Sequence, residues 1–254
     1  MRKLLRFPWL LGGLGWAAIS GSGEMLRIRA DEWMPYNGNP KAEHPGYAID
    51  VLREIFTPLG IQIEYQTMPW GDALKAAKDG EIEAVVGANT REGAGLVLPA
   101  QEIGNPRVGL FVRKGSTWVY ENPLSFKKIH LGAIQDYKYW DTLDDYILKH
   151  DAPLVTKFSG NTPLNDAVAQ LDAGLIDVMP ETYTVFMWFV RNSGRKVANY
   201  QYVYLDAGDP VYVAFKPNPD GRHYAAVFDA GLEKLRKSGK LSQILLRYGL
   251  TDWR

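Results

Sequence analysis

The sequence has 254 residues, with 29 Lys and Arg balanced by 29 Asp and Glu, and 46% of its residues are hydrophobic. This composition is typical of a globular protein, and the length suits one large domain or two lobes of about 100 residues each. The absence of cysteine excludes disulfides, cysteine-ligated zinc, iron–sulfur clusters and thiol nucleophiles, and the balanced charge argues against a nucleic-acid partner.

The first twenty residues have the layout of a secretory signal peptide. A basic stretch at residues 2–6 precedes an apolar run over residues 7–19, and Ala18 and Ser20 stand at −3 and −1 of a cleavage site. A membrane-spanning helix needs about 20 apolar residues, more than this run provides. We therefore expect a signal peptide over residues 1–20 and an exported, soluble periplasmic protein without a lipid anchor. An uncleaved N-terminal anchor is the alternative.

The next part of the chain alternates between strand and helix patterns. Short β-rich runs are separated by stretches with apolar residues at helical spacing, and Gly60 and Gly80 stand where the helices should end. This βαβαβ order predicts a parallel sheet with helices on its faces. The expected strands cover residues 26–30, 61–65 and 82–87, and the expected helices cover residues 49–59 and 70–77.

The same alternation returns in the second half, which predicts a second, similar lobe. A strand over residues 129–134 is followed by helices near residues 143–147 and 164–171, and residues 170–179 echo residues 76–85 as helix end, glycine and strand. Extended segments at 108–113 and 211–215 should cross between the lobes, and two closing helices should pack back on the first lobe. We expect lobe 1 at residues 24–112 plus 214–254, and lobe 2 at residues 113–213.

Motifs for catalysis are missing from the sequence. None of the four histidines has metal-ligand spacing, and no G-x-S-x-G motif occurs. The pairs Glu81/Glu83 and Asp144/Asp145 are expected on solvated surfaces. We therefore expect no catalytic residue, no metal and no cofactor. The 8 Trp and 14 Tyr exceed what a core usually needs, which favours a ligand-binding cleft.

Several stretches, taken in order, resemble the family 3 extracellular solute-binding proteins, the periplasmic receptors of amino-acid-type ABC importers. They are residues 26–30, 33–36, 46–50, 68–74, 80–87, 131–137, 174–177 and 232–244. The resemblance implies a two-lobed α/β fold of the type II periplasmic-binding-protein class. Two parallel-dominated sheets flanked by helices would be joined by a two-strand hinge. It also implies a monomer that binds a small polar, amino-acid-like solute between closing lobes and delivers it to an inner-membrane ABC permease.

The resemblance also nominates ligand-binding residues. Trp33, Tyr36 and Trp70 would form aromatic walls. Arg91, after Asn89 and Thr90, would bind a ligand carboxylate, although the family's T-x-x-R pattern puts the arginine where this chain has Gly93. We therefore treat the chain as a divergent member, and a surface salt bridge is the alternative role for the arginine.

The second lobe would supply the remaining contacts. Glu181 would hold an ammonium group, one residue before the family's usual acidic position, and Asp136, Tyr137 and Tyr139 would line the cleft at a helix N-terminus. Two alternatives stay open. A cyclohexadienyl dehydratase-like enzyme on the same fold would use Glu181 as a general acid, and a periplasmic sensor or adaptor module would signal instead of transporting.

Overall fold

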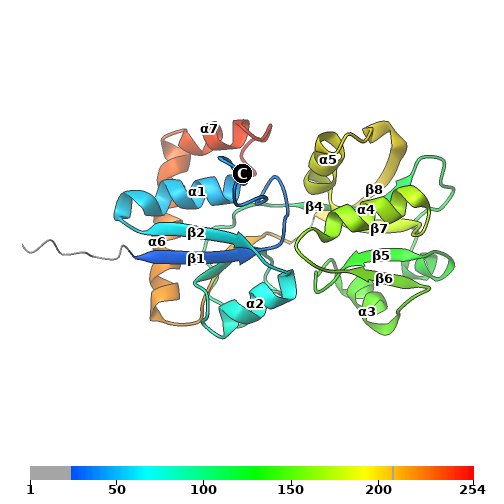
Figure 1. The fold of residues 1–254 in the computed structure, drawn as a ribbon, viewed down its shortest axis with the longest axis horizontal. Coiled ribbons are helices and arrows are strands. Elements are labelled where there is room, and N and C mark those ends of the chain that lie inside the picture. The colour runs from blue at the N-terminus through cyan, green and yellow to red at the C-terminus, as the bar shows by residue number, and fades with distance from the viewer. Residues whose placement is uncertain (1–23, 208) are drawn as a thin grey trace, which may run out of the picture.

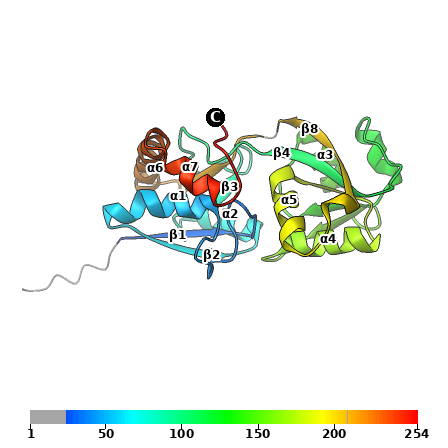
Figure 2. The ribbon, with the colours of Figure 1, turned by 90° about the horizontal axis from the view of Figure 1, so that it is seen from above.

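A computed structural model describes residues 24–207 and 209–254. Figures 1 and 2 show two α/β lobes side by side, each built around one twisted sheet. The signal peptide expected over residues 1–20 lies outside the described residues. Within them, no helix has both the length and the apolar character required to span a bilayer.

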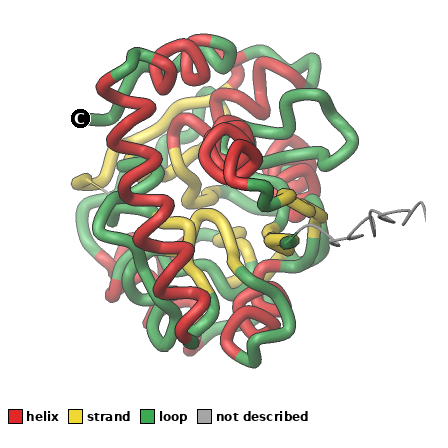
Figure 3. Tube along the Cα trace, turned by 90° about the vertical axis from the view of Figure 1, so that its left-hand side faces the viewer, coloured by secondary structure: helices red, strands yellow, loops and turns green. Residues whose placement is uncertain are grey.

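Lobe 1 is built on a four-stranded sheet of order β2-β1-β3-β9. Strands β1 (Met25–Ala30), β2 (Gln62–Thr67) and β3 (Ala84–Ala88) are parallel, and β9 (Tyr212–Phe215) is antiparallel to β3. The helices are α1 (Tyr47–Phe56), α2 (Trp70–Lys78), α6 (Pro219–Lys237) and α7 (Lys240–Leu246), with the 3-10 turn η1 (Thr57–Leu59) after α1. In Figure 1, α1 and α7 lie on one side of the sheet and α2 on the other. The longest helix, α6, runs along the outside of the lobe (Figure 3).

Lobe 2 is built on a five-stranded sheet of order β6-β5-β7-β4-β8. Its strands are β4 (Arg107–Arg113), β5 (Leu131–Ile134), β6 (Val155–Phe158), β7 (Val178–Thr182) and β8 (Tyr200–Ala207), of which β4 runs antiparallel to both neighbours. The helices are α3 (Asp141–Lys149), α4 (Pro163–Ala173) and α5 (Tyr183–Asn192), with 3-10 turns η2 (Pro123–Lys128) and η3 (Val197–Asn199). The two sheets flanked by helices confirm the expected fold class.

The sheets divide the chain slightly differently from the expected lobes. Strand β4 pairs along its length with β7 and β8, so residues 107–112 lie in the second sheet and not in lobe 1. Strand β9 already belongs to the first sheet from Tyr212. The expected and observed boundaries differ because the sequence of an apolar extended segment does not indicate which sheet it joins. The connecting segments are paired instead at Gly104 and Val211, where Val211 N donates to Gly104 O at 2.9 Å.

The two helix–glycine–strand units have the same local structure. Gly80 after α2 and Gly174 after α4 have φ of 78° and 75°, a left-handed conformation that glycine adopts without a Cβ clash. The following amides, of Glu81 and Leu175, donate to carbonyls of the preceding helix, each at 2.9 Å. The repeated sequence pattern therefore reflects the same helix termination in both lobes.

Candidate functional site

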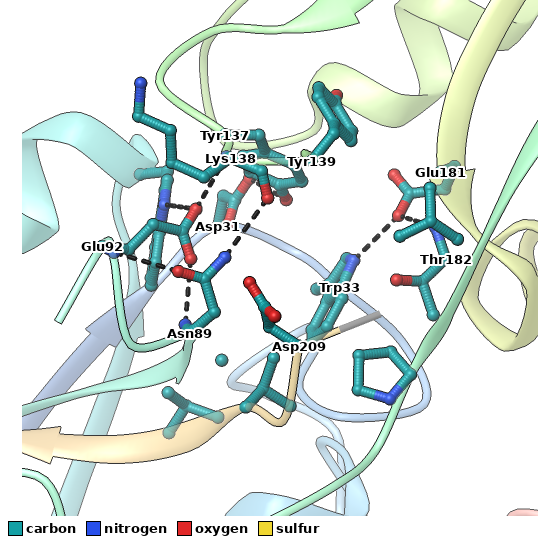
Figure 4. Close-up of a pocket in the computed structure, with 16 residues that line it drawn as sticks. Asp31, Trp33, Asn89, Glu92, Tyr137, Lys138, Tyr139, Glu181, Thr182 and Asp209 are labelled. Carbon is teal, nitrogen blue, oxygen red and sulfur yellow. Dashed lines mark hydrogen bonds between the residues drawn. The ribbon is translucent and has the colours of Figure 1, made fainter. Parts of the chain in front are cut away.

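A pocket of about 60 Å³ lies between the lobes, and both lobes contribute to its walls (Figure 4). In lobe 1, Asp31 and Asn89 directly follow β1 and β3, and Trp70 opens α2 after β2. In lobe 2, Tyr137 follows β5 and Glu181 lies at the end of β7. The side chains therefore gather at the carboxyl ends of parallel strands, where ligands bind in open α/β sheets.

Trp33 forms one aromatic wall and reaches across to lobe 2. Its ring stacks on Tyr36 with centroids 4.1 Å apart, and its Nε1 donates to Glu181 Oε1 at 3.1 Å. Gly87 makes room for this ring, since a Cβ there would lie 3.3 Å from it. Tyr36 is buried behind Trp33 and does not line the pocket, so it supports the wall from behind.

Trp70 and Tyr137 form the opposite wall, one from each lobe. Their rings meet edge to face at 6.4 Å. Trp70 Nε1 donates to Glu92 Oε1 at 3.1 Å, and the Tyr137 hydroxyl donates to Asp31 Oδ2 at 2.7 Å. Both aromatic side chains are thus held by carboxyl groups that line the same pocket.

Glu92 is a buried carboxyl group with three N–H donors. Besides Trp70 Nε1, the backbone amides of Lys138 and Asn89 donate to it, each at 3.0 Å. Lys138 belongs to lobe 2, so this carboxyl links the lobes. Burial raises the pKa of Glu92 to about 7, although these hydrogen bonds act in the opposite direction.

Glu181 is almost completely buried, with 1% of its surface exposed. Its Oε1 accepts hydrogen bonds from Trp33 Nε1 and from the amide of Thr182, the latter at 2.6 Å, whereas its Oε2 has no partner in the described part of the chain. Burial raises the pKa of Glu181 to about 7. In Figure 4 this carboxyl group is turned toward the pocket.

Asp31 is the third buried carboxyl group of the pocket. Burial, helped by the charges of Glu181 and Glu92, raises its pKa to about 8, although the hydrogen bond from Tyr137 acts in the opposite direction. Lys138 is the only basic residue among the described residues that line the pocket, and Figure 4 shows its side chain directed away. The more exposed Asp209 adds a fourth acidic group. The pocket is therefore aromatic and acidic.

Arg91, expected to bind a ligand carboxylate, lies outside this pocket. Its Nη1 donates to Asp141 and Asp144 of α3 at 2.9 and 2.7 Å, and its Nη2 donates to the Tyr139 carbonyl at 3.0 Å. Asp209 lies 3.4 Å from its Nε. The arginine thus forms salt bridges between the lobes, the alternative role given above. The Asp144 side chain, which pairs with this arginine, is only 11% exposed, so the prediction that it lies on a solvated surface is wrong.

Six of the ten nominated residues line the pocket: Trp33, Trp70, Asn89, Tyr137, Tyr139 and Glu181. The exposed Thr90 and the half-buried Arg91 face a neighbouring hollow, and Asp136 lies at another hollow close to Gly71. The prediction of a helix N-terminus at Asp136 is wrong, because α3 begins at Asp141.

Asp31, Glu92 and Asp209 also line the pocket but were not predicted from the sequence. The position of Asp31 at the carboxyl end of a predicted strand was an available signal. Glu92 and Asp209 lie in loops with no such signal. Among residues 24–207 and 209–254, no group of three His, Asp or Glu side chains is arranged to hold a metal ion.

The sequence matches the model of the bacterial extracellular solute-binding proteins, family 3, over residues 26–251. No curated protein is a significant match. Among solved structures, an ancestral arginine-binding protein bound to glutamine is 18% identical, with a TM-score of 0.71 over 88% of this chain and 97% of that chain.

Two further structures are similar at the level of the fold. One comes from work on glutathione import via GshT and the cystine ABC importer TcyBC of Streptococcus mutans; it has a TM-score of 0.72 and 16% identity, over 91% of this chain and 98% of that chain. The other is a histidine kinase sensor domain with similarity to periplasmic binding proteins, with a TM-score of 0.71 and 19% identity, over 89% of this chain and 96% of that chain.

Proposed function

Since the chain belongs to the bacterial extracellular solute-binding proteins of family 3, we propose that it binds a small polar solute between its lobes and delivers it to an ABC permease in the inner membrane. The observation that carries this proposal is the pocket itself, whose walls come from both lobes. A ligand there contacts both sides and favours the closed arrangement by its higher affinity for that state.

The hydrogen bonds around the pocket fit such a closing receptor. Trp33 bonds to Glu181, Asp31 to Tyr137 and Glu92 to the Lys138 amide, in each case from one lobe to the other. Separating the lobes would break all three bonds and divide the pocket into two half-sites. Ligand capture and lobe closure are therefore coupled in this proposal.

A thermal-shift screen of residues 24–254 tests this function, followed by calorimetry on each hit. The panel contains amino acids, amines, organic acids and sugars. A ligand at 1,000 times its Kd adds about 4 kcal/mol to the free energy of unfolding, which corresponds to a rise of about 8–16 °C in Tm. We expect one hit class, 1:1 stoichiometry, recovery of the ligand unchanged and a smaller radius of gyration in solution scattering. Binding at several weak sites without compaction would refute the proposal.

A second candidate function is catalysis by Glu181, as in a dehydratase. The observation that favours it is a buried carboxyl group whose pKa of about 7 allows it to donate a proton at neutral pH. Incubation with prephenate or arogenate separates the two functions, because turnover to an aromatic product supports the enzyme and its absence supports the receptor.

A sensory role is the third candidate, supported by the fold shared with a histidine kinase sensor domain. It predicts that the ligand-bound protein associates with a membrane signalling partner rather than with a permease. Crosslinking in membranes of the producing cell, with and without the ligand, distinguishes the two partners.

A further inference from the structure

The pocket contains an acceptor that the protein leaves without a donor. Glu181 Oε2 is buried and has no hydrogen-bond partner among residues 24–207 and 209–254, while its neighbour Oε1 accepts two bonds. A buried carboxylate oxygen without a donor is unfavourable, since it has lost its hydrogen bonds to water without replacement. A ligand with an N–H group at this point would supply the missing bond.

Three N–H donors that could bind a ligand carboxylate are already occupied. The backbone amides of Asn89 and Lys138 and the indole N–H of Trp70 all donate to Glu92, a carboxyl group of the chain itself. They come from both lobes, as the donors for a bridging anion would. Glu92 thus occupies the place that the carboxylate of an amino-acid ligand needs.

Arg91 does not provide a replacement anchor. Its terminal nitrogens donate to Asp141, Asp144 and the Tyr139 carbonyl, so several acidic groups already balance its one positive charge. A ligand carboxylate inside the pocket would instead meet Asp31 and Glu181, with no inward-facing cation among the described lining residues.

We infer that the pocket binds a small organic cation that has N–H donors and no carboxylate, such as a primary alkylamine or a guanidine. This inference rests on the proposed function and specifies its substrate class. The N–H groups bond to Glu181 Oε2, and Asp31 supplies a second acidic group. The aromatic rings of Trp33 and Trp70, which line the pocket, attract the cation electrostatically. The volume of about 60 Å³ is room for about four to six waters, which limits the ligand to a short chain.

The test compares amino acids with the amines that remain when their carboxylate is removed. The pairs are ornithine and putrescine, lysine and cadaverine, and arginine and agmatine, measured by calorimetry at pH 7.5. We expect the amine of at least one pair to bind at least tenfold more tightly than its parent amino acid. Tetramethylammonium, which has no N–H donor, should bind at least tenfold more weakly than that amine.

Two variants examine the two carboxyl groups separately. Glu181→Gln keeps the acceptor for Trp33 and removes the charge, so amine affinity should fall at least tenfold. Glu121→Gln, an exposed site in the same lobe, is the charge-matched control and should leave the affinity unchanged. Glu92→Ala frees the amides of Asn89 and Lys138, so ornithine should gain at least tenfold in affinity relative to putrescine. An unchanged ratio in the Glu92 variant would show that these amides do not decide selectivity.

The outcomes separate this inference from the proposed function. An amino acid that binds as tightly as its amine overturns the inference and leaves a solute receptor. A sugar or an organic acid as the one ligand has the same consequence. No binding by any member of the panel overturns both. The wild-type comparison of each pair needs no variant, so a variant that fails to fold does not remove the test.

Discussion

Replacing Glu181 by glutamine should change how the stability of the ligand-free protein depends on pH. Burial raises the pKa of this carboxyl group from 4.5 to about 7. The folded protein therefore binds its proton more tightly than the unfolded chain does. The stability associated with the neutral group is complete below pH 4.5 and is lost as the pH rises through about 7.

The size of this loss follows from the shift in pKa. A difference of about 2.5 units corresponds to about 3 kcal/mol between pH 4.5 and pH 8.5. Glutamine cannot ionise, so the variant should lose about 3 kcal/mol less than wild type over that range. The side-chain amide of the new glutamine has no partner among the described residues at the Oε2 position. This lowers the free energy of unfolding by an amount that does not change with pH. The comparison therefore concerns the slopes with pH and not the absolute stabilities.

The assay is urea unfolding followed by tryptophan fluorescence at half-unit steps from pH 5 to pH 8.5. Asp31 and Glu92 stay in the variant and keep a residual slope, because burial raises the pKa of each as well. Tyr137 and Tyr139, also close to the pocket, stay neutral over this range because burial raises their pKa well above 10. The exposed Glu121→Gln variant should parallel wild type. Parallel curves for Glu181→Gln and wild type would refute the reasoning, because Glu181 would then ionise as an exposed carboxyl group does.

Three further predictions follow from the contacts around the pocket. Arg91→Ala removes ion pairs between the lobes and should shift the ligand-free protein toward the open state by about 1–2 kcal/mol, seen as a larger radius of gyration in solution scattering. Lys75→Ala, which breaks an exposed ion pair with Asp79 at the end of α2, should leave the radius unchanged. Gly87→Ala places a Cβ against Trp33 at a φ of 100°, whereas Gly115→Ala adds a Cβ at a φ of 85° with nothing within 4 Å. Chemical unfolding should therefore show a greater loss of unfolding free energy for Gly87→Ala. Equal losses in the two variants would contradict the contact with Trp33. Amine binding at pH 6.5 should release protons, because a bound cation lowers the pKa of the buried carboxyl groups. Calorimetry in buffers of different ionisation enthalpy should then show a binding enthalpy that depends on the buffer. A buffer-independent binding enthalpy would contradict the predicted proton release.

The fold was largely predictable from the sequence because its signals are local. Helical spacing, strand runs and the glycines after α2 and α4 each report on a few neighbouring residues. The edge strands β6 and β8 were missed. Val155–Phe158 has only four residues, and no neighbouring motif identifies it as a strand. The pairing of β4 depends on strands far away in the sequence, so its place in the second sheet could not be predicted from local patterns.

The candidate site was predictable only where a residue type stands at a typical position. Trp33, Trp70 and Glu181 were nominated because they match positions that line the cleft in the family that the sequence resembles, and all three line the pocket. The partners of Arg91 come from α3 and from the segment before β9, which no local pattern brings together. The burial of Asp31 and Glu92 is likewise a property of lobe packing, since sequence hydropathy places acidic residues at the surface.

The order of the strands also has a consequence for synthesis on the ribosome. Lobe 2 is contiguous in sequence from β4 to β8, whereas lobe 1 needs β9, α6 and α7 from the last part of the chain. During synthesis, all the strands of lobe 2 have therefore been made while lobe 1 still lacks β9. Until α6 is made, α1 lacks its contact between Phe56 and Tyr224. This apolar face of α1 therefore stays uncovered in the nascent chain, where exposed hydrophobic surface is prone to aggregate and is bound by chaperones.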